Sequence, residues 1–455
     1  MKRLFSLALI LGSLNLSAQF KPVLSAARPY SSDPGAVFLS YSNEWNDFML
    51  FGRNEHSERI YSLVMTDDAD EISLTSDIRV ATQVEDNHFS LAGLALAGRN
   101  LTAFVESRNF KTGRNVMAMQ AVDNKGGLTS EGMLVGYFDF KDEAHPGKWY
   151  IASSPDQKSI ALIAQLPEPG KFLYYYLGEN LTILRKGSFT ISNTGNKVLK
   201  LKQFLTSDKG DLFLVAEGSA SNKHYPLVYK SAAGSDECVP VPMDIAQVVG
   251  ESGAYLAAVN PEGALVIAGY LQSKTAEKSA GTWIFDGYRL SSQSFASPVQ
   301  ALKVNNLAFG KDVVYLNGQS ENSIHVAGFN AAGAGKFNLT IAREHSAGEM
   351  HHQHSMANAE LPEHGIASGI LRDQLCLVYN DPAGKYKHGA DGMVPVAVSV
   401  SKTGVLSKPI VYTGLFESSE DNAMVLPRFF SANEDHIRVL ANTENGIRVI
   451  TFRAE

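Results

Sequence analysis

The sequence is poor in the features that mark several classes of protein. It has 2 Cys among 455 residues, which is too few for a disulfide-stabilised scaffold. Its formal net charge of −7 argues against nucleic acid or an anionic membrane as the main partner. Hydrophobic residues make up 44 % of the chain, enough for a large core, so a disordered or collagen-like protein is excluded.

Long apolar runs and amphipathic helical periodicity are also missing. After the N-terminus no segment reaches the roughly 20 apolar residues of a transmembrane helix, so we expect none in the mature chain. Short runs rich in Val, Ile, Phe and Tyr recur instead, separated by Gly, Asn, Asp, Ser and Pro. This pattern is typical of strands joined by turns, and it predicts an all-β protein.

The N-terminus has the parts of a secretory signal peptide. Lys2 and Arg3 precede an apolar run at Leu4–Leu14, and small residues follow up to Ala18. We therefore predict a signal peptide at 1–18 and an exported protein, periplasmic or extracellular. Removal of the two basic residues changes the formal charge to −9, with 38 basic against 47 acidic residues.

A polar turn followed by an aliphatic strand recurs along the chain with a nearly constant period. The spacings between successive turns are 54, 56, 52, 53, 49, 63 and 60 residues. The turns are marked by Asn46, Asn100, Asp156, Asp208, Pro261, Gly310, Asp373 and Asn433. Such a period indicates a repeat architecture, and about 50 residues can hold four short strands with their turns.

These repeats predict a single β-propeller of four-stranded blades at 19–455, with eight blades as the first reading and seven as the alternative. A sheet this small cannot bury both faces alone, so neighbouring blades must cover it, and ring closure removes the exposed edges. The last repeat has room for three strands only. We expect a strand around Lys21–Ala26 or Ala36–Ser40 to complete it and close the ring.

One repeat adds a family resemblance. The stretch Ser154–Ala161 reads SPDQKSIA, and Thr206–Gly210 is a looser copy. It resembles the repeat of TolB-like and WD40-like propellers, in which this turn joins the two inner strands of a blade. The sequence departs from that repeat at Gln157, where the family has Gly. The resemblance implies a fold and no particular function, because propellers serve as receptors, scaffolds and enzymes.

Histidine is the most unevenly distributed residue. Six of the 12 His lie between His345 and His388, within or just after the longest spacing of the array. We interpret residues 343–366 as an inserted His-rich loop on one face. Imidazoles bind zinc and copper, and thioethers bind Cu(I), so the loop is a candidate zinc or copper site. The candidate ligands are His345, Met350, His351, His352, His354 and Met356. A solvated loop without a metal role is the alternative.

No catalytic motif is recognisable elsewhere in the sequence. The chain lacks H-E-x-x-H, the segment Gly250–Ala254 fails the G-x-S-x-G pattern, and no phosphate-binding loop is present. Cys238 and Cys376 fall in the fourth and seventh repeats, too far apart to pair.

The sequence is therefore compatible with three functions. We favour a non-catalytic propeller that binds a protein, peptide or carbohydrate on one face. The alternatives are a hydrolase or lactonase whose site converges from several loops, and a periplasmic metal-binding protein that uses the His-rich loop.

Overall fold

The fold is known from a computed structural model, which describes the placement of 20 segments of the chain. These are 20–24, 39–42, 47–55, 58–66, 71–98, 100–123, 126–129, 132–191, 199–220, 223–242, 255–272, 278–285, 290–295, 303–320, 323–343, 366–386, 393–412, 424–432, 435–443 and 446–454. Within these ranges, no helix has the length and apolar character needed to cross a membrane.

In the described part of the chain, the strands form eight sheets, seven of four strands and one of five. The first sheet contains β2 (Leu39–Ser42), β3 (Asp47–Glu55), β4 (Glu58–Thr66) and β5 (Ile72–Ala81). The second contains β6 (Gln83–Val84), β7 (Asn87–Ala97), β8 (Asn100–Asn109), β9 (Arg114–Ala121) and β10 (Met133–Asp139). The third contains β11 (Lys148–Ser153), β12 (Ile160–Gln165), β13 (Lys171–Leu177) and β14 (Ile183–Thr190). The fourth contains β15 (Leu201–Thr206), β16 (Leu212–Ala220), β17 (Lys223–Ser231) and β18 (Val239–Pro240).

The remaining sheets follow the same plan. The fifth contains β19 (Tyr255–Val259), β20 (Leu265–Gln272), β21 (Lys278–Phe285) and β22 (Leu290–Phe295). The sixth contains β23 (Lys303–Phe309), β24 (Val314–Ser320), β25 (Ser323–Phe329) and β26 (Gly335–Ala342). The seventh contains β27 (Ala367–Leu371), β28 (Gln374–Pro382), the 3-10 turn η3 (Ala383–Lys385), β29 (Met393–Val400) and β30 (Ile410–Val411). The last contains β31 (Met424–Ala432), β32 (His436–Thr443), β33 (Gly446–Ala454) and β1 (Phe20–Leu24).

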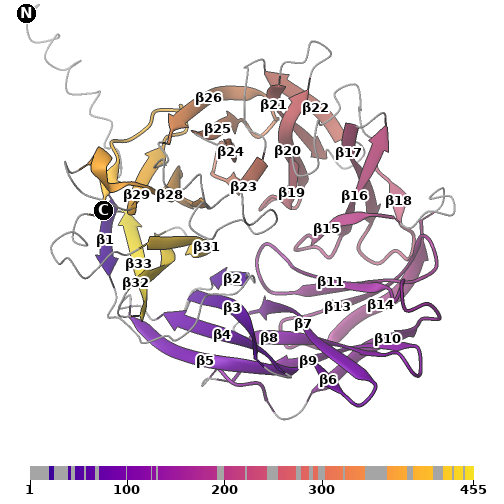
Figure 1. Cartoon of the computed structure of the whole chain (residues 1–455). Coiled ribbons are helices and arrows are strands. Elements are labelled where there is room, and N and C mark those ends of the chain that lie inside the picture. The colour runs from indigo at the N-terminus through magenta and orange to yellow at the C-terminus, as the bar shows by residue number, and fades with distance from the viewer. Residues whose placement is uncertain are drawn as a thin grey trace, which may run out of the picture.

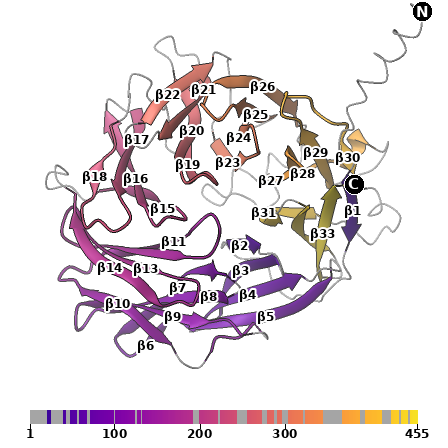
Figure 2. The ribbon, with the colours of Figure 1, turned by 180° about the vertical axis from the view of Figure 1, so that it is seen from behind.

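The sheets follow one another around a ring, and β11, β15, β19 and β23, each the first strand of its sheet, lie toward the centre (Figures 1 and 2). Neighbouring strands of each sheet are antiparallel and, apart from β1, follow the chain order. This arrangement confirms the predicted all-β propeller. One detail of the prediction was wrong: the second sheet has a fifth strand, because β6 pairs with the edge of β7 opposite β8, through Gln83↔His88 and Val84↔Asn87.

The ring is closed by the N-terminal strand. β1 pairs with β33 antiparallel, from Phe20↔Ala454 to Leu24↔Ile450, as the outer strand of the last sheet. Of the two segments proposed for this role, the first is therefore confirmed. The second overlaps β2, which pairs with β3 in the first sheet. The last sheet therefore combines strands from opposite ends of the sequence. Removing β1 would leave the outer edge of β33 without its hydrogen-bonding partner.

The core lies between adjacent sheets. β12 is buried along its whole length, with alternate residues facing opposite neighbours. Ala161 and Ile163 pack against Leu214 of the fourth sheet. Ile160 and Leu162 pack on the other side, with residues of the second sheet. A middle strand with both faces covered needs apolar residues at consecutive positions, which explains the unbroken aliphatic runs of the sequence.

A five-residue turn recurs at one end of the sheets. In the turn Ser207–Asp211, the Gly210 N–H donates to the Ser207 carbonyl at 2.9 Å, and the Asp211 N–H donates to the Ser207 hydroxyl at 3.1 Å. Gly210 has a φ of 84°, which a type I turn followed by a left-handed residue requires. The same pattern, with Asn or Ser first and Gly fourth, is built on Asn260, Asn330 and Ser401.

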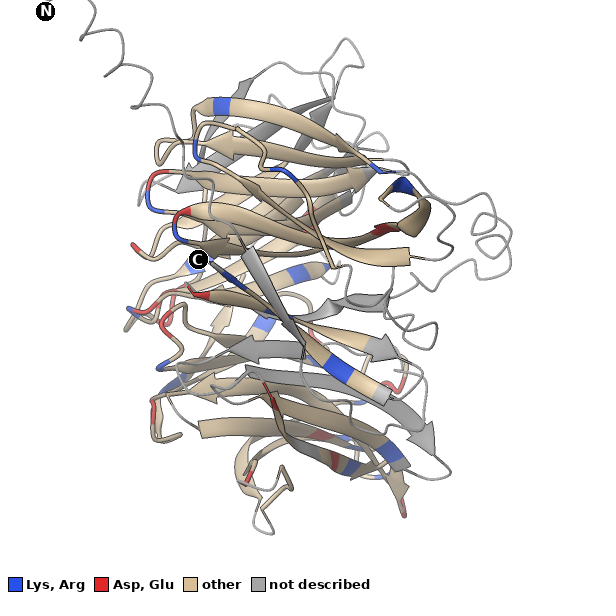
Figure 3. Ribbon diagram, turned by 90° about the vertical axis from the view of Figure 1, so that its left-hand side faces the viewer, with Lys and Arg blue, Asp and Glu red and all other residues tan. Residues whose placement is uncertain are grey.

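These turns define the two faces of the ring. The end that carries the turns between first and second strands, and between third and fourth strands, is called the turn face here. The opposite end, where the chain passes from one sheet to the next, is called the crossover face. The resemblance to TolB-like repeats predicted that Ser154–Ala161 joins two inner strands, and it does, between β11 and β12. In the side view, the short turns along one edge carry acidic and basic residues close together (Figure 3).

The two cysteines are free and buried; Cys238 directly precedes β18 of the fourth sheet, and Cys376 lies on β28 of the seventh. Burial raises the pKa of the Cys238 thiol to about 12, and it raises the pKa of the Cys376 thiol as well. Both thiols therefore stay protonated near neutral pH and act as small apolar side chains.

Candidate functional site: a charged pocket on the turn face

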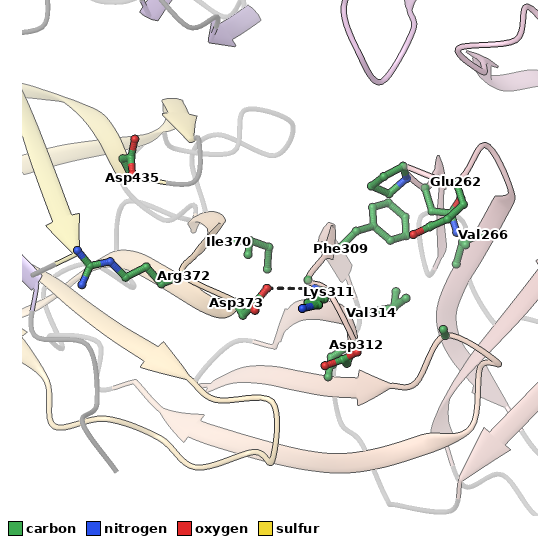
Figure 4. Close-up of a pocket in the computed structure, with 15 residues that line it drawn as sticks. Glu262, Val266, Phe309, Lys311, Asp312, Val314, Ile370, Arg372, Asp373 and Asp435 are labelled. Carbon is green, nitrogen blue, oxygen red and sulfur yellow. Dashed lines mark hydrogen bonds between the residues drawn. The ribbon is translucent and has the colours of Figure 1, made fainter. Parts of the chain in front are cut away.

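A pocket of about 610 Å³ opens among the turns of four consecutive sheets. Its walls come from the turns that join the first and second strands of the fifth, sixth, seventh and last sheets, with one further residue from a third-to-fourth turn (Figure 4). The residues around it are Asn260, Pro261, Glu262, Val266, Phe309, Gly310, Lys311, Asp312, Val313, Val314, Ala331, Ile370, Arg372, Asp373 and Asp435. A cavity of this size is within the range of small-ligand sites.

Both charged and apolar side chains line the pocket. Four carboxylates and two cations line it, which gives a formal charge of −2. The half-buried Phe309 and Ile370 supply the apolar surface. In Figure 4, Glu262 and Asp435 lie on opposite sides of the pocket, with Ile370 and Phe309 between them. A cationic group with some apolar surface would suit this lining better than an anion would, because each extra carboxylate attracts it and the aromatic face adds to the attraction.

One wall of the pocket is a strained turn. Arg372 and Asp373 form the two-residue connection between β27 and β28, because Leu371 pairs with Gln374. Both residues have positive φ, 44° for Arg372 and 64° for Asp373. A turn with two positive φ angles is usually built from Asn-Gly, and a non-glycine residue there costs about 1–2 kcal/mol. The chain thus keeps an Arg and an Asp where Asn-Gly would be less strained, and strained turns of this kind cluster at functional sites.

The strained turn is held by the sixth sheet. The Asp373 carboxylate accepts a hydrogen bond from the Lys311 N–H at 3.3 Å, drawn as a dashed line in Figure 4, and the Asp373 carbonyl accepts one from the Tyr315 hydroxyl at 3.2 Å. Tyr315 is fully buried, and burial together with the Asp373 carboxylate raises the pKa of its phenol to about 12. Two neighbouring turns are therefore fixed relative to one another before any ligand arrives.

The opposite wall is shaped by the repeated turn described above. The Asn260 carboxamide accepts from the Ala264 N–H at 2.7 Å, and Gly263 takes the left-handed position with a φ of 86°. This geometry places Pro261 and Glu262 at the tip of the turn, at the mouth of the pocket. The local sequence Asn-Pro-Glu-Gly accordingly determines where the Glu262 carboxylate stands.

The predicted metal ligands cannot be placed. His345, Met350, His351, His352, His354 and Met356 all lie outside the described residues. The described residues on either side, Arg343 and Ile366, are buried. Arg343 donates to the Asn380 carbonyl at 3.2 Å, at the crossover face. Among the described residues, no group of three or more His, Cys, Asp or Glu side chains is positioned to hold a metal ion.

A second polar cluster lies on the crossover face, at the start of β25. The Ser323 hydroxyl is 2.8 Å from Nε2 of His325, and Nδ1 of His325 is 3.1 Å from the Thr340 hydroxyl. Burial lowers the pKa of His325, so the imidazole is neutral near pH 7. A neutral imidazole that donates from Nδ1 to Thr340 can accept the Ser323 proton at Nε2.

Sequence reasoning did not identify the pocket, although it used the same turns as repeat marks. Pro261, Gly310 and Asp373 each marked one repeat, but nothing in a linear pattern shows that three turns some 50 to 60 residues apart share a cavity. One local signal was available. Arg372-Asp373 stands between two aliphatic runs at the position of a two-residue hairpin turn, where Asn-Gly is the usual choice.

Comparison with known proteins supports no narrower assignment. No protein-family model and no curated protein matches the sequence. Among solved structures, the chain is similar to a structure from a study of two prolyl endopeptidases, at 10 % identity and a TM-score of 0.41, over 87 % of this chain and 55 % of that chain. It therefore spans little more than half of that protein. It is also similar to the polysaccharide lyase Uly1, at 10 % identity and a TM-score of 0.43, over 86 % of this chain and 98 % of that one. The WD40 domain of SCAP from fission yeast has 11 % identity and a TM-score of 0.42, over 96 % and 98 % of the two chains. The propeller assignment rests on the sheets and their order.

Proposed function

We propose that this protein is an exported, non-catalytic propeller that binds its ligand in the pocket of the turn face. The observation that carries the proposal is the strained Arg372-Asp373 turn at the wall of a preformed cavity. Strain of this kind persists only where the surrounding structure holds it, and here two hydrogen bonds from the sixth sheet do so.

The ligand carries a positive charge. The pocket has two more carboxylates than cations, and the mature chain has a net charge of −9 (38 basic against 47 acidic residues), so both the local and the overall field attract cations. Phe309 and Ile370 add apolar contact for the part of the ligand next to the charge. A basic side chain of a protein or peptide, or a small organic amine, has this chemistry.

The proposal includes the sequence predictions on architecture and export. The eight sheets are eight blades of one ring at 19–455, and the segment 1–18 is removed during secretion. N-terminal sequencing of the protein purified from the periplasm or medium tests export, and a mature chain that begins at Gln19 is the expected result. Recovery of the chain in the cytoplasm with Met1 still present would refute export.

Titration calorimetry with spermidine as the cationic ligand tests the binding function, with citrate as the anionic comparison. We expect spermidine to bind and citrate not to bind. Exposed ion pairs contribute about 0.2–1 kcal/mol each, so Glu262→Gln and Asp435→Asn should each weaken spermidine binding by about 1.4-fold to fivefold. Glu168→Gln, an exposed acid in the β12–β13 turn of the crossover face, is the matched control and should bind as the wild type does. Equal loss in the control, or no spermidine binding by the wild type, would reject the pocket as a cation site.

A hydrolase is the second candidate, favoured by the Ser323–His325–Thr340 cluster. In this reading the Ser323 oxygen attacks the carbonyl carbon of an ester as its proton passes to Nε2 of His325. The imidazolium then protonates the leaving alcohol, and water releases the acyl group from Ser323.

Labelling with a fluorophosphonate decides between the two functions. A hydrolase requires modification of Ser323, detected by peptide mass spectrometry, and its loss in His325→Gln. An unlabelled Ser323 in the folded wild-type protein excludes the hydrolase and leaves the binding function.

A further inference from the structure

Exposed aliphatic side chains recur at the turn-face end of several sheets. Nine large apolar side chains are exposed among the described residues, and seven of them lie at the turn-face end of an outer strand or in the turn before it. Five belong to three consecutive sheets: Met133 and Leu134 on β10, Ile183 and Leu184 on β14, and Val239 on β18. The other two, Val405 and Leu406, lie between β29 and β30 in the seventh sheet.

Their position follows from the topology. The third strand of each sheet runs toward the turn face, and the fourth strand starts there. Met133 pairs with Met119 near the end of β9, and Val239 pairs with Lys230 near the end of β17. These aliphatic residues therefore lie on the outer part of the same face whose inner part holds the pocket.

The exposure is large for such side chains. Leu184 is 64 % exposed, and Val405 is 55 % exposed. Single exposed apolar residues are ordinary on protein surfaces, but seven at equivalent places on one face are not explained by packing within the sheets. Exposed apolar surface that folding does not require is typical of sites that bind other proteins.

The seventh sheet joins the two features. It supplies Arg372 and Asp373 to the pocket, and it carries Val405 directly after the turn at Gly404. That turn lies against Phe337 of the sixth sheet, since a Cβ added at Gly404 would come within 2.6 Å of the Phe337 ring. The Phe337 ring in turn lies 6.1 Å from the ring of Tyr315, whose hydroxyl donates to the Asp373 carbonyl. The aliphatic pair Val405–Leu406 is thus linked to the pocket wall through packed aromatic residues.

We propose that the turn face docks a protein partner through a segment that carries a Lys or Arg next to aliphatic residues. This inference rests on the proposed function and deepens it. The basic side chain enters the pocket, where the net charge of −2 complements it, and the adjoining aliphatic residues cover Val405 and Leu406. A lipid surface fits less well, because anionic headgroups would be repelled by the acidic pocket and by the acidic chain as a whole.

Selection from a library of linear peptides displayed on phage tests the proposal, with the full mature chain as the target. We expect the selected peptides to contain a Lys or Arg with aliphatic neighbours. We expect Glu262→Gln to weaken the binding of a selected peptide by about threefold, which is the effect expected from losing one exposed ion pair. The double variant Val405→Ser/Leu406→Ser should weaken it by tenfold or more. Val84→Ser, which changes a 51 % exposed aliphatic residue on β6 near the crossover face, is the matched control and should bind as the wild type does.

The outcomes separate the inference from the function on which it rests. Peptide binding that depends on Glu262 but not on Val405 and Leu406 overturns the docking surface and leaves the cation pocket. Selected peptides without basic residues, or loss in Val84→Ser as large as in the double variant, overturn the inference too. Sedimentation with phosphatidylcholine vesicles should leave the protein in solution, and vesicle binding that disappears in the double variant would assign the face to lipid instead.

Discussion

Gln157 offers a sharp test of how the repeated turns are built. It occupies the left-handed position of the turn between β11 and β12, with a φ of 56°, where four other turns of this face have Gly. A non-glycine residue in this conformation costs about 1–2 kcal/mol, whereas Gly adds about 0.5–1 kcal/mol of backbone entropy to the unfolded state. We therefore expect Gln157→Gly to raise the free energy of unfolding by about 0.5–1 kcal/mol.

The hydrogen bonds of Gln157 in this turn are made by its backbone, so the substitution should change the strain without removing them. The Gln157 carbonyl accepts from the Gly98 N–H at 2.7 Å, and the Gln157 N–H donates to the Ser154 carbonyl at 2.9 Å. Both are backbone bonds, so Gly keeps them. Gln157→Ala is the matched control, because it removes the side chain beyond Cβ but keeps Cβ and with it the strain of the positive φ.

Urea denaturation of the three proteins, followed by fluorescence, measures the effect. The expected order of midpoints is Gln157→Gly first, with wild type and Gln157→Ala close together below it. A stability of Gln157→Gly below that of the wild type, or the same gain in both variants, would refute the turn-strain reasoning.

Four further predictions concern the pocket, the pH dependence, the closure and the metal. Replacing Arg372-Asp373 by Asn-Gly should raise the free energy of unfolding by about 1–2 kcal/mol in urea melts, because both native residues have positive φ; an equal or lower stability of the variant would refute the strain at this turn. Burial raises the pKa of Asp208, and the nearby carboxylate of Asp156 raises it as well. The folded state therefore holds the Asp208 proton more tightly than the unfolded state does. Its protonation therefore stabilises the protein below the unfolded pKa, and this contribution is lost as pH rises through the folded pKa; Asp208→Asn should be the more stable protein at pH 7, with an advantage that shrinks toward pH 4 in melts. Deletion of 19–38 removes β1 but not β2 and should lower the Tm by several degrees, and an unchanged Tm would contradict the closure. If the His-rich loop binds zinc or copper, alanine at the three histidines of His351–His354 should abolish bound metal measured by plasma mass spectrometry, and equal metal content would reject that site.

The fold could be predicted from the sequence because each repeat depends on local features, namely particular turn residues followed by an aliphatic strand. The turns marked by Asp156 and Asp208 need particular residues at particular places, and the aliphatic runs after them need burial on both faces. Both requirements leave a pattern in a single chain. The closing role of Phe20–Leu24 was also predictable, because the last repeat is short by one strand.

The site was not accessible in the same way. Glu262, Arg372 and Asp435 belong to different sheets, and ring geometry alone brings them to one cavity. The extra strand β6 could not be predicted from the sequence for another reason. It has two residues, and the turn after it places Glu85 at a φ of 53°, which no residue preference would indicate.

A crystal structure of the mature protein grown with spermidine is the sharpest test of the cation pocket. We expect the polyamine in the turn-face pocket, with ammonium groups at Glu262 and Asp435 and its methylene chain over Phe309. An empty pocket at a spermidine concentration that saturates the protein in solution, or binding at another place on the ring, would contradict it.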